Sequence, residues 1–301
     1  MKLKYWIYAM RLHTLPLSIT GITLSFLISK FRGFEEYIVY ILCLITALFL
    51  QILANISNDY GDNIRGLYNF NSFGSNKRVQ CSFISFLKIK KGIYLFSILS
   101  FISGLFLIYK TISINDIFIF FLYFLGIFIC IYSSIFYSIG SKPYGYKTGI
   151  SDLLVLFFFG IISVQGSYFL YTHTLKIDIF LLSLSIGLLN VAVLNINNIR
   201  DIDNDYKHGK YTMAVWLGIK YAKIYHIFII FLSVFFGGMF IFLNQIKNIQ
   251  WYFFIFFIFF IILHIKNIII IKDNKLFNLE LKKLIFITFL YGLSTGISFF
   301  L

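Results

Sequence analysis

Long apolar runs, separated by short polar stretches, make up most of the chain from residue 12 onward. About nine of these runs have roughly the 20 residues that a helix needs to cross a hydrocarbon core of about 30 Å. The runs are continuously apolar, whereas the strands of a membrane barrel alternate apolar and polar residues, so the pattern favours helices. We therefore predict an all-α integral membrane protein. The predicted spans are residues 12–30, 37–57, 92–109, 116–137, 150–171, 177–198, 221–243, 250–271 and 283–301.

Composition supports this prediction. Hydrophobic residues make up 59% of the 301 residues and charged residues only 13%. A soluble domain of this length could not bury so much apolar surface. The first run carries Arg11 and His13 near its start, and no small-residue cleavage site follows it. We interpret it as a retained helix rather than a signal peptide, and treat residues 1–301 as a single transmembrane domain.

The basic residues divide unequally between the two sides of the predicted helices. Of the 26 lysines and arginines, 21 lie on the side of the amino terminus. Cytoplasmic loops carry such an excess, so we expect the amino terminus in the cytoplasm and the carboxyl terminus in the periplasm of a bacterium, with the protein in the inner membrane. The net charge of +14 then reflects topology and contact with anionic lipid, and requires no nucleic-acid partner. The five basic residues on the opposite side of the membrane are Lys30, Arg32, Lys110, Lys176 and Lys247.

Several kinds of site find no support in the sequence. Cys43, Cys81 and Cys130 have neither paired spacing nor neighbouring histidines, which argues against a disulfide framework or a zinc site. The chain contains no Walker loop and no G-x-G-x-x-G motif. Nucleotide-driven transport is therefore not indicated.

Acidic residues gather at two places. Five of the nine aspartates fall within residues 55–62 and 197–205, and each cluster follows a long apolar run. Carboxylates are scarce near a bilayer, so their grouping indicates a function. In a helix, the spacing within each cluster places its main polar residues on one face. These faces consist of Asn55, Asp59 and Asp62 in the first cluster and Asn197, Asp201 and Asp205 in the second.

Two facing clusters of carboxylates suit Mg²⁺, which prefers oxygen ligands and completes its shell with water and phosphate oxygens. Two such ions could clamp a pyrophosphate. The alternative is that both clusters are solvated helix ends, which explains one cluster more readily than two at equivalent positions. The similar segments 54–58 and 194–198 also suggest two related halves.

Four polar segments, in a fixed order, carry a resemblance to a known family. They are Arg11 to Pro16, Asn58 to Gly66, Tyr137 to Tyr146 with Asp152, and Asn197 to Asp205 with Gly209 to Thr212 and Leu217-Gly218. Together they resemble the UbiA superfamily of intramembrane aromatic prenyltransferases. Its members have nine transmembrane helices around a central cavity and two aspartate-rich motifs on the cytoplasmic side. The closer resemblance is to the branch that acts on 1,4-dihydroxy-2-naphthoate in menaquinone biosynthesis.

The resemblance implies a Mg²⁺-dependent transfer of a polyprenyl group from polyprenyl diphosphate to 1,4-dihydroxy-2-naphthoate. Carbon dioxide and pyrophosphate leave, and demethylmenaquinol forms. The implied metal ligands, also implied to be catalytic, are Asp59, Asp62, Asp201 and Asp205, with Lys142 as a further catalytic residue. The implied substrate-binding residues are Arg11, Asn55, Asn58, Tyr60, Arg65, Tyr146, Asp152, Asn197, Asn198, Arg200 and Lys210.

The basic residues in this set are expected to hold phosphate oxygens or the naphthoate carboxylate, where negative charge develops. The alternative for each is an ordinary positive charge of a cytoplasmic loop. These residues are Arg65, Lys142, Arg200 and Lys210.

The remaining implied residues also have two interpretations. Tyr60 and Tyr146 either face the allylic cation, which aromatic rings attract, or simply close the cavity. Asp152 is either a charge at a helix amino terminus or a site carboxylate that orients a base or a hydroxyl group. His13 and His208 are interpreted as interfacial rather than catalytic.

The chain also departs from the family pattern. Gly66 stands where the wider superfamily has a third acidic residue, and the loop 67–80 has asparagines where relatives carry acidic residues. Leu12 replaces a proline. The departure in the loop puts its contribution to metal or diphosphate binding in doubt.

Three alternatives remain at this stage. The first is a family member for another acceptor, such as 4-hydroxybenzoate, or of the haem or chlorophyll type. The second is a secondary transporter, which predicts carboxylates near the middle of the membrane rather than at its edge. The third is an inactive relative that binds lipid or quinone.

Overall fold

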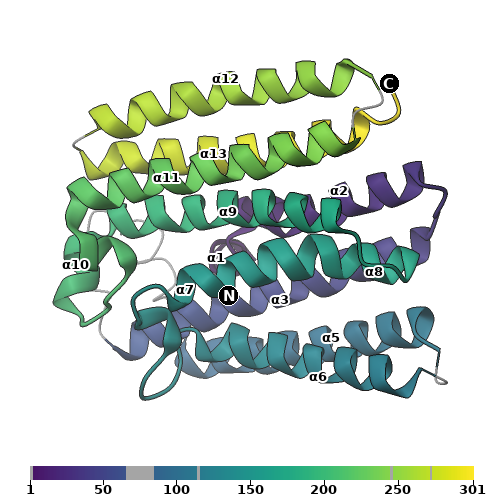
Figure 1. The fold of residues 1–301 in the computed structure, drawn as a ribbon. Helices are drawn as coiled ribbons and strands as arrows, with labels where there is room; N and C mark the ends of the chain where they lie inside the picture. Colours follow the sequence, from purple (N-terminus) through teal and green to yellow (C-terminus); the bar gives the residue numbers. More distant parts are fainter. Residues whose placement is uncertain (1–2, 66–84, 114–115, 245–246, 272) are drawn as a thin grey trace.

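The computed structural model describes residues 3–65, 85–113, 116–244, 247–271 and 273–301. All regular elements within these residues are helical, and the long helices lie side by side (Figure 1). The fold class is therefore confirmed. The loop 67–80 and Cys81 lie outside the described residues, so the expectation about this loop stays a prediction.

The amino-terminal part consists of one short helix, a helical turn and four long helices. These are α1 (Leu3–Ala9), η1 (Leu12–Thr14), α2 (Leu15–Phe31), α3 (Tyr37–Ile64), α5 (Phe86–Thr111) and α6 (Ile117–Phe136).

The carboxyl-terminal part contains a composite span and four further long helices. The elements are η2 (Tyr144–Tyr146), α7 (Ile150–Val155), η3 (Leu156–Gly166), α8 (Ser167–Thr172), α9 (Ile177–Arg200), α10 (Ile202–Lys207), α11 (Met213–Asn244), α12 (Ile249–Ile270) and α13 (Asn274–Ile297).

Each of the nine predicted spans corresponds to a helical segment. Eight segments among the described residues are long and apolar enough to cross a membrane, and α13 occupies the place of the ninth. Several helices extend beyond the predicted spans: α3 continues to Ile64, and α11 begins at Met213. The sequence pattern marks only the apolar part of a helix, whereas backbone hydrogen bonds continue into the polar segment beyond it.

Helix α9 forms the centre of the bundle and packs against α11, α13 and η3. Its contact with η3 is made through two glycines. A Cβ added to Gly160 would lie 2.5 Å from the carbonyl oxygen of Ser183, and one added to Gly187 would lie 2.9 Å from that of Leu156. Small residues of this kind allow two helix backbones to touch directly.

The span between α7 and α8 is a π-helix, η3, of 11 residues. A π-helix is wider than an α-helix because its hydrogen bonds reach five residues along the chain, and such segments are frequent at functional sites. Here it connects α7, which carries Asp152, to α8 at the other end of the same span.

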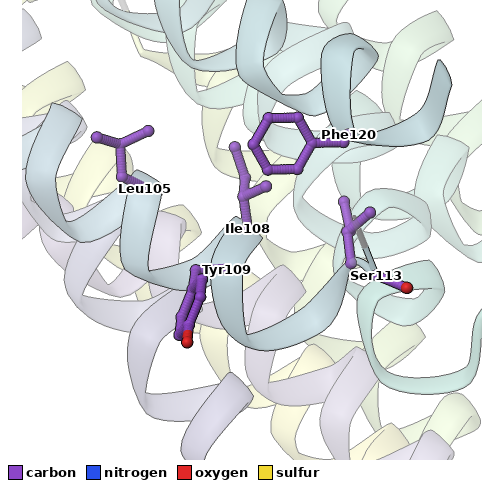
Figure 2. Close-up of a pocket in the computed structure, with 6 residues that line it drawn as sticks. Leu105, Ile108, Tyr109, Ser113 and Phe120 are labelled. Carbon is purple, nitrogen blue, oxygen red and sulfur yellow. The ribbon is translucent and has the colours of Figure 1, made fainter. Parts of the chain in front are cut away.

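Helices α5 and α6 lie at one side of the bundle (Figure 1), and none of the side chains of α6 is buried. At the end of these helices remote from both aspartate clusters lies a cavity of about 550 Å³, with Ile108 and Phe120 in its wall (Figure 2). None of the described residues that line it is charged. This cavity is therefore not the place where an anionic substrate would bind.

Candidate active site

The carboxyl-terminal ends of α3 and α9 bring both aspartate clusters to the same end of the bundle, which we call the site end. It is the end at which α10 lies in Figure 1. All four predicted carboxylates are buried, with 2% to 8% of their surface exposed. Burial of a charge requires compensating partners. The four residues are Asp59, Asp62, Asp201 and Asp205.

Asp59 is paired with a basic residue from the segment between α1 and α2. The guanidinium of Arg11 donates to Asp59 Oδ1 at 2.5 Å, and the amide of Asn55 donates to the carbonyl oxygen of Met10 at 2.9 Å. Arg11 has a left-handed backbone conformation, with φ of 49°, which is uncommon outside glycine. The first segment of the sequence motif is thus fastened to the first aspartate cluster.

Asp62 is partnered by the loop that follows α6. The hydroxyl of Tyr146 donates to Asp62 Oδ1 at 2.9 Å. The guanidinium of Arg65 lies 4.5 Å from the centre of the Tyr146 ring and donates to the carbonyl oxygens of Ser138, at 2.8 Å, and Gly140. One face of the Tyr146 ring therefore carries a guanidinium, and a role of this ring toward an allylic cation stays a prediction.

A glycine permits this loop to approach α3 so closely. A Cβ on Gly61 would lie 2.3 Å from the carbonyl oxygen of Ser138, which is too close for any other residue unless the backbone moves. The hydroxyl of Ser138 also donates to Asn58 Oδ1 at 2.5 Å. Asn58 therefore orients the loop, with the loop's Ser138 as its donor.

Lys210 joins the two clusters. Its ammonium lies 3.4 Å from Asp205 Oδ2 and 5.7 Å from the centre of the Tyr146 ring. Burial alone would lower the pKa of Lys210, but the carboxylates of Asp205 and Asp62 raise it above its ordinary value. A buried ammonium thus lies beside Asp205 of the second cluster and near the Tyr146 ring, whose hydroxyl binds Asp62 of the first.

Tyr137, at the end of α6, faces the same group of charges. Burial raises the pKa of its hydroxyl; Lys210 opposes this effect, while Asp152, Asp205 and Asp62 add to it. Three carboxylates from three parts of the chain therefore act on the pKa of one tyrosine. Tyr137 begins one of the four segments that carry the family resemblance, but it was not among the expected site residues.

Arg200 is occupied by protein groups. Its guanidinium makes two hydrogen bonds to the carboxylate of Asp201, at 2.6 and 3.0 Å, and one to Asn197 Oδ1 at 2.7 Å. A further bond of 2.7 Å reaches Asn278 Oδ1 on α13. This arrangement holds the second cluster in place and connects it to the last helix. Asn278 was not anticipated from the sequence.

Several predicted residues occupy other kinds of position. Tyr60 packs edge to face on Phe86 of α5, with 5.1 Å between ring centres, and so helps close the bundle. Lys142 is exposed, and no hydrogen bond or ion pair connects it to the described residues. Asn198 is buried, and its amide Nδ2 has no partner among the described residues. A buried unpaired donor of this kind suits a phosphate oxygen.

Asp152 stands slightly apart from the two clusters. It is buried, with 6% of its surface exposed, and its Oδ2 accepts a hydrogen bond of 2.9 Å from the hydroxyl of Tyr225 on α11. Tyr225 was not anticipated from the sequence, because α7 and α11 are far apart along the chain and come together only in the folded protein.

The carboxylates fit Mg²⁺ in chemical type, since they are buried oxygen donors. Within the described residues, however, no three acidic, histidine or cysteine side chains converge on one point. Each carboxylate instead meets an arginine, a lysine or a tyrosine hydroxyl. The arrangement is a pair of anionic clusters with cationic and hydroxyl donors between them, which can receive a diphosphate together with its cations.

Comparison with known proteins agrees with this geometry. The chain is 43% identical over 232 residues to 1,4-dihydroxy-2-naphthoate octaprenyltransferase of Haemophilus influenzae, which covers 75% of this chain and 73% of the relative. It is 38% identical over 221 residues to the enzyme of the same name from Escherichia coli, with 73% and 71% covered.

Among solved structures, a UbiA homologue from Archaeoglobus fulgidus bound to GPP and Mg²⁺ has the same fold. The TM-score is 0.69 at 12% identity, with 99% of this chain and 100% of that chain covered. The model of the UbiA prenyltransferase family matches residues 18–290. The resemblance inferred from the four polar segments is thereby confirmed, and the chain belongs to the UbiA prenyltransferase family.

Proposed function

We propose that this protein transfers a polyprenyl group from polyprenyl diphosphate to 1,4-dihydroxy-2-naphthoate, with loss of carbon dioxide and pyrophosphate, in menaquinone biosynthesis. The observation that carries the proposal is the pair of buried aspartate clusters joined through Lys210 and Tyr146 at the site end. The names of the relatives support the choice of acceptor.

The four aspartates Asp59, Asp62, Asp201 and Asp205 are the residues that would hold Mg²⁺. When bound, the metal neutralises the negative charge that grows on the departing diphosphate. The structure of a homologue bound to GPP and Mg²⁺ supports the use of this metal.

Residues of the chain itself bind and orient the diphosphate. Lys210 and Arg65 supply fixed positive charge beside Asp62, and Asn198 supplies an unpaired amide donor on the neighbouring helix. Preorganised donors of this kind stabilise the charge that develops during bond cleavage. Tyr146 holds Arg65 and Asp62 in position, through its ring and its hydroxyl group respectively.

The reaction joins a ring carbon of the acceptor to the first carbon of the prenyl chain, while the bond from that carbon to the diphosphate breaks. A site shielded from water prevents hydrolysis of the reactive prenyl carbon. The polyprenyl chain is apolar, so it lies along the apolar helices. We place the site end in the cytoplasm, because 21 of the 26 basic residues lie on that side.

The test is to incubate membranes containing the protein with a polyprenyl diphosphate and either 1,4-dihydroxy-2-naphthoate or 4-hydroxybenzoate, with Mg²⁺ or with EDTA. We expect a prenylated naphthoquinol only in the presence of Mg²⁺. Prenylation of 4-hydroxybenzoate alone would contradict the proposed acceptor, whereas full activity in EDTA would contradict the metal assignment.

A further inference from the structure

A second cavity begins beside the site end and is separate from the aspartate clusters. It has a volume of about 330 Å³ and lies between α7 with η3, α9 and α11. Leu188 and Val191 of α9 contribute to its lining, with Leu156 on one side and Phe228 on the other. A cavity of this size suits a small, largely apolar molecule.

Two polar side chains lie in this cavity, Asp152 and Tyr225; every other lining residue is apolar or glycine. Tyr225 donates to Asp152 Oδ2, and Oδ1 of the same carboxylate accepts no hydrogen bond of normal geometry from the described residues, although the Ser151 hydroxyl lies near the carboxylate. A buried carboxylate oxygen without a donor is energetically unfavourable. Asp152 Oδ1 can therefore accept a hydrogen bond from a hydroxyl group of a bound ligand.

The charge of the cavity restricts the ligand. Its lining contains one carboxylate and no lysine, arginine or histidine, so a diphosphate would be repelled. A ligand that is apolar in body and presents a hydroxyl group to Asp152 satisfies both the lining and the unpaired oxygen. An aromatic ring with a phenolic hydroxyl has this chemistry.

The polar end of the cavity adjoins the aspartate clusters. The backbone N–H of Tyr211 donates to the carbonyl oxygen of Tyr146 at 3.1 Å, and the hydroxyl of Thr148 donates to the backbone carbonyl oxygen of Tyr211 at 3.0 Å. These two bonds hold the segment of Tyr146 and Thr148, which leads into α7, against Tyr211, the residue after Lys210. A molecule held at Asp152 would therefore lie beside the diphosphate site.

We propose that Asp152 binds a phenolic hydroxyl of the aromatic acceptor, whose ring lies in the cavity between α7, α9 and α11. Tyr225 is a positioning residue that fixes the orientation of the carboxylate. The hydrogen bond places negative charge next to the hydroxyl and so favours attack by the ring on the prenyl carbon. This inference rests on the proposed function, which supplies the phenolic acceptor.

The first experiment measures KM for both substrates in Asp152→Asn and Tyr225→Phe. In Asp152→Asn the Tyr225 hydroxyl can still donate to the side-chain amide oxygen. The amide NH₂ group then faces the hydroxyl of the aromatic acceptor and cannot accept its hydrogen bond. We expect KM for the acceptor to rise about tenfold in Asp152→Asn and about threefold in Tyr225→Phe, with KM for the prenyl diphosphate nearly unchanged. Asp203→Asn, at an exposed position of α10, is the matched control. A rise in KM for the prenyl diphosphate in Asp152→Asn would overturn the inference.

The second experiment measures equilibrium binding and does not depend on turnover. Wild-type protein should bind 1,4-dihydroxy-2-naphthoate about tenfold more tightly than its 1,4-dimethoxy analogue. In Asp152→Asn this preference should disappear. Because both ligands are compared on the same protein sample, partial misfolding cannot produce this result. An unchanged preference in Asp152→Asn would overturn the inference.

The two experiments separate this inference from the proposed function. If wild-type protein prenylates 4-hydroxybenzoate instead of the naphthoate, the proposed acceptor is wrong. The inference about Asp152 is then decided by the same KM comparison with 4-hydroxybenzoate, and by the binding of 4-hydroxybenzoate against 4-methoxybenzoate.

Discussion

The ammonium group of Lys210 lies 3.4 Å from the carboxylate of Asp205, in a position that is buried and also close to Asp62. The same ammonium lies 5.7 Å from the centre of the Tyr146 ring, whose hydroxyl binds Asp62 of the first cluster, so Lys210 connects two clusters that are far apart in sequence. This arrangement gives Lys210 a structural role before substrate binds and a binding role once a diphosphate is present.

Replacing Lys210 by methionine should therefore affect both stability and binding. The change leaves the carboxylates of Asp205 and Asp62 without their shared cation, and breaking a buried pair destabilises proteins by about 3 kcal/mol or more. We expect a lower unfolding temperature and a raised KM for the prenyl diphosphate. Lys210→Arg, which keeps the charge, should recover most of the stability. Equal loss in both variants would show that side-chain shape, rather than charge, matters at this position.

The pH dependence of this contribution follows from the direction of the pKa change. The folded protein raises the pKa of Lys210, so the stabilisation is fully present below the ordinary lysine pKa of about 10.4 and is lost only as pH rises beyond it. The difference in unfolding free energy between wild type and Lys210→Met should be constant from about pH 6 to pH 9. A difference that declines across this range would contradict the role assigned to Asp205 and Asp62.

Loss of a cluster carboxylate should abolish turnover without unfolding the protein. Asp59→Asn and Asp201→Asn should each reduce the rate by about a hundredfold or more, because a group that stabilises developing charge is removed. The measurement is the initial rate at saturating Mg²⁺, with Asp203→Asn as a control of equal charge. Nearly full activity in both Asp59→Asn and Asp201→Asn would exclude the clusters as the reaction site.

Two glycines provide a matched test of the contact between α3 and the loop. A Cβ at Gly61 would lie 2.3 Å from the Ser138 carbonyl oxygen, whereas a Cβ at Gly126 of α6 meets nothing within 4 Å. Gly61→Ala should lower stability by about 1 to 3 kcal/mol and reduce activity by displacing Tyr146. Gly126→Ala should leave activity unchanged and raise stability by up to about 1 kcal/mol. The measurements are the thermal unfolding and the initial rate of both variants. Equal effects of the two substitutions would contradict the close contact assigned to Gly61.

The helices and the grouping of carboxylates could be predicted, because both depend on local sequence. Apolar length located all nine segments, and helical spacing placed Asp59 and Asp62 on one face. The same spacing also accounts for Tyr60: it follows Asp59 directly, so it is rotated by about 100° from it and faces α5.

The partners of these residues could not be predicted. Tyr225 and Asn278 contact the site from elements distant in sequence, and nothing in their immediate neighbours distinguishes them from other polar residues. Ser138 lies in a motif segment, but its contact with Asn58 depends on how the loop packs on α3. Lys142 belongs to a motif but is exposed, and its predicted catalytic role stays a prediction. Side-chain contacts between distant segments depend on packing, which a pattern along one chain does not specify.

The π-helix η3 imposes a condition on chain length as well as on side chains. It connects Asp152 in α7 to the close glycine contact with α9, which fixes the far part of the same span. Deleting one residue between them would turn α7 by about 100° about its axis and move Asp152 out of the cavity. In this segment the number of residues, independent of their identity, is therefore part of what fixes the position of Asp152.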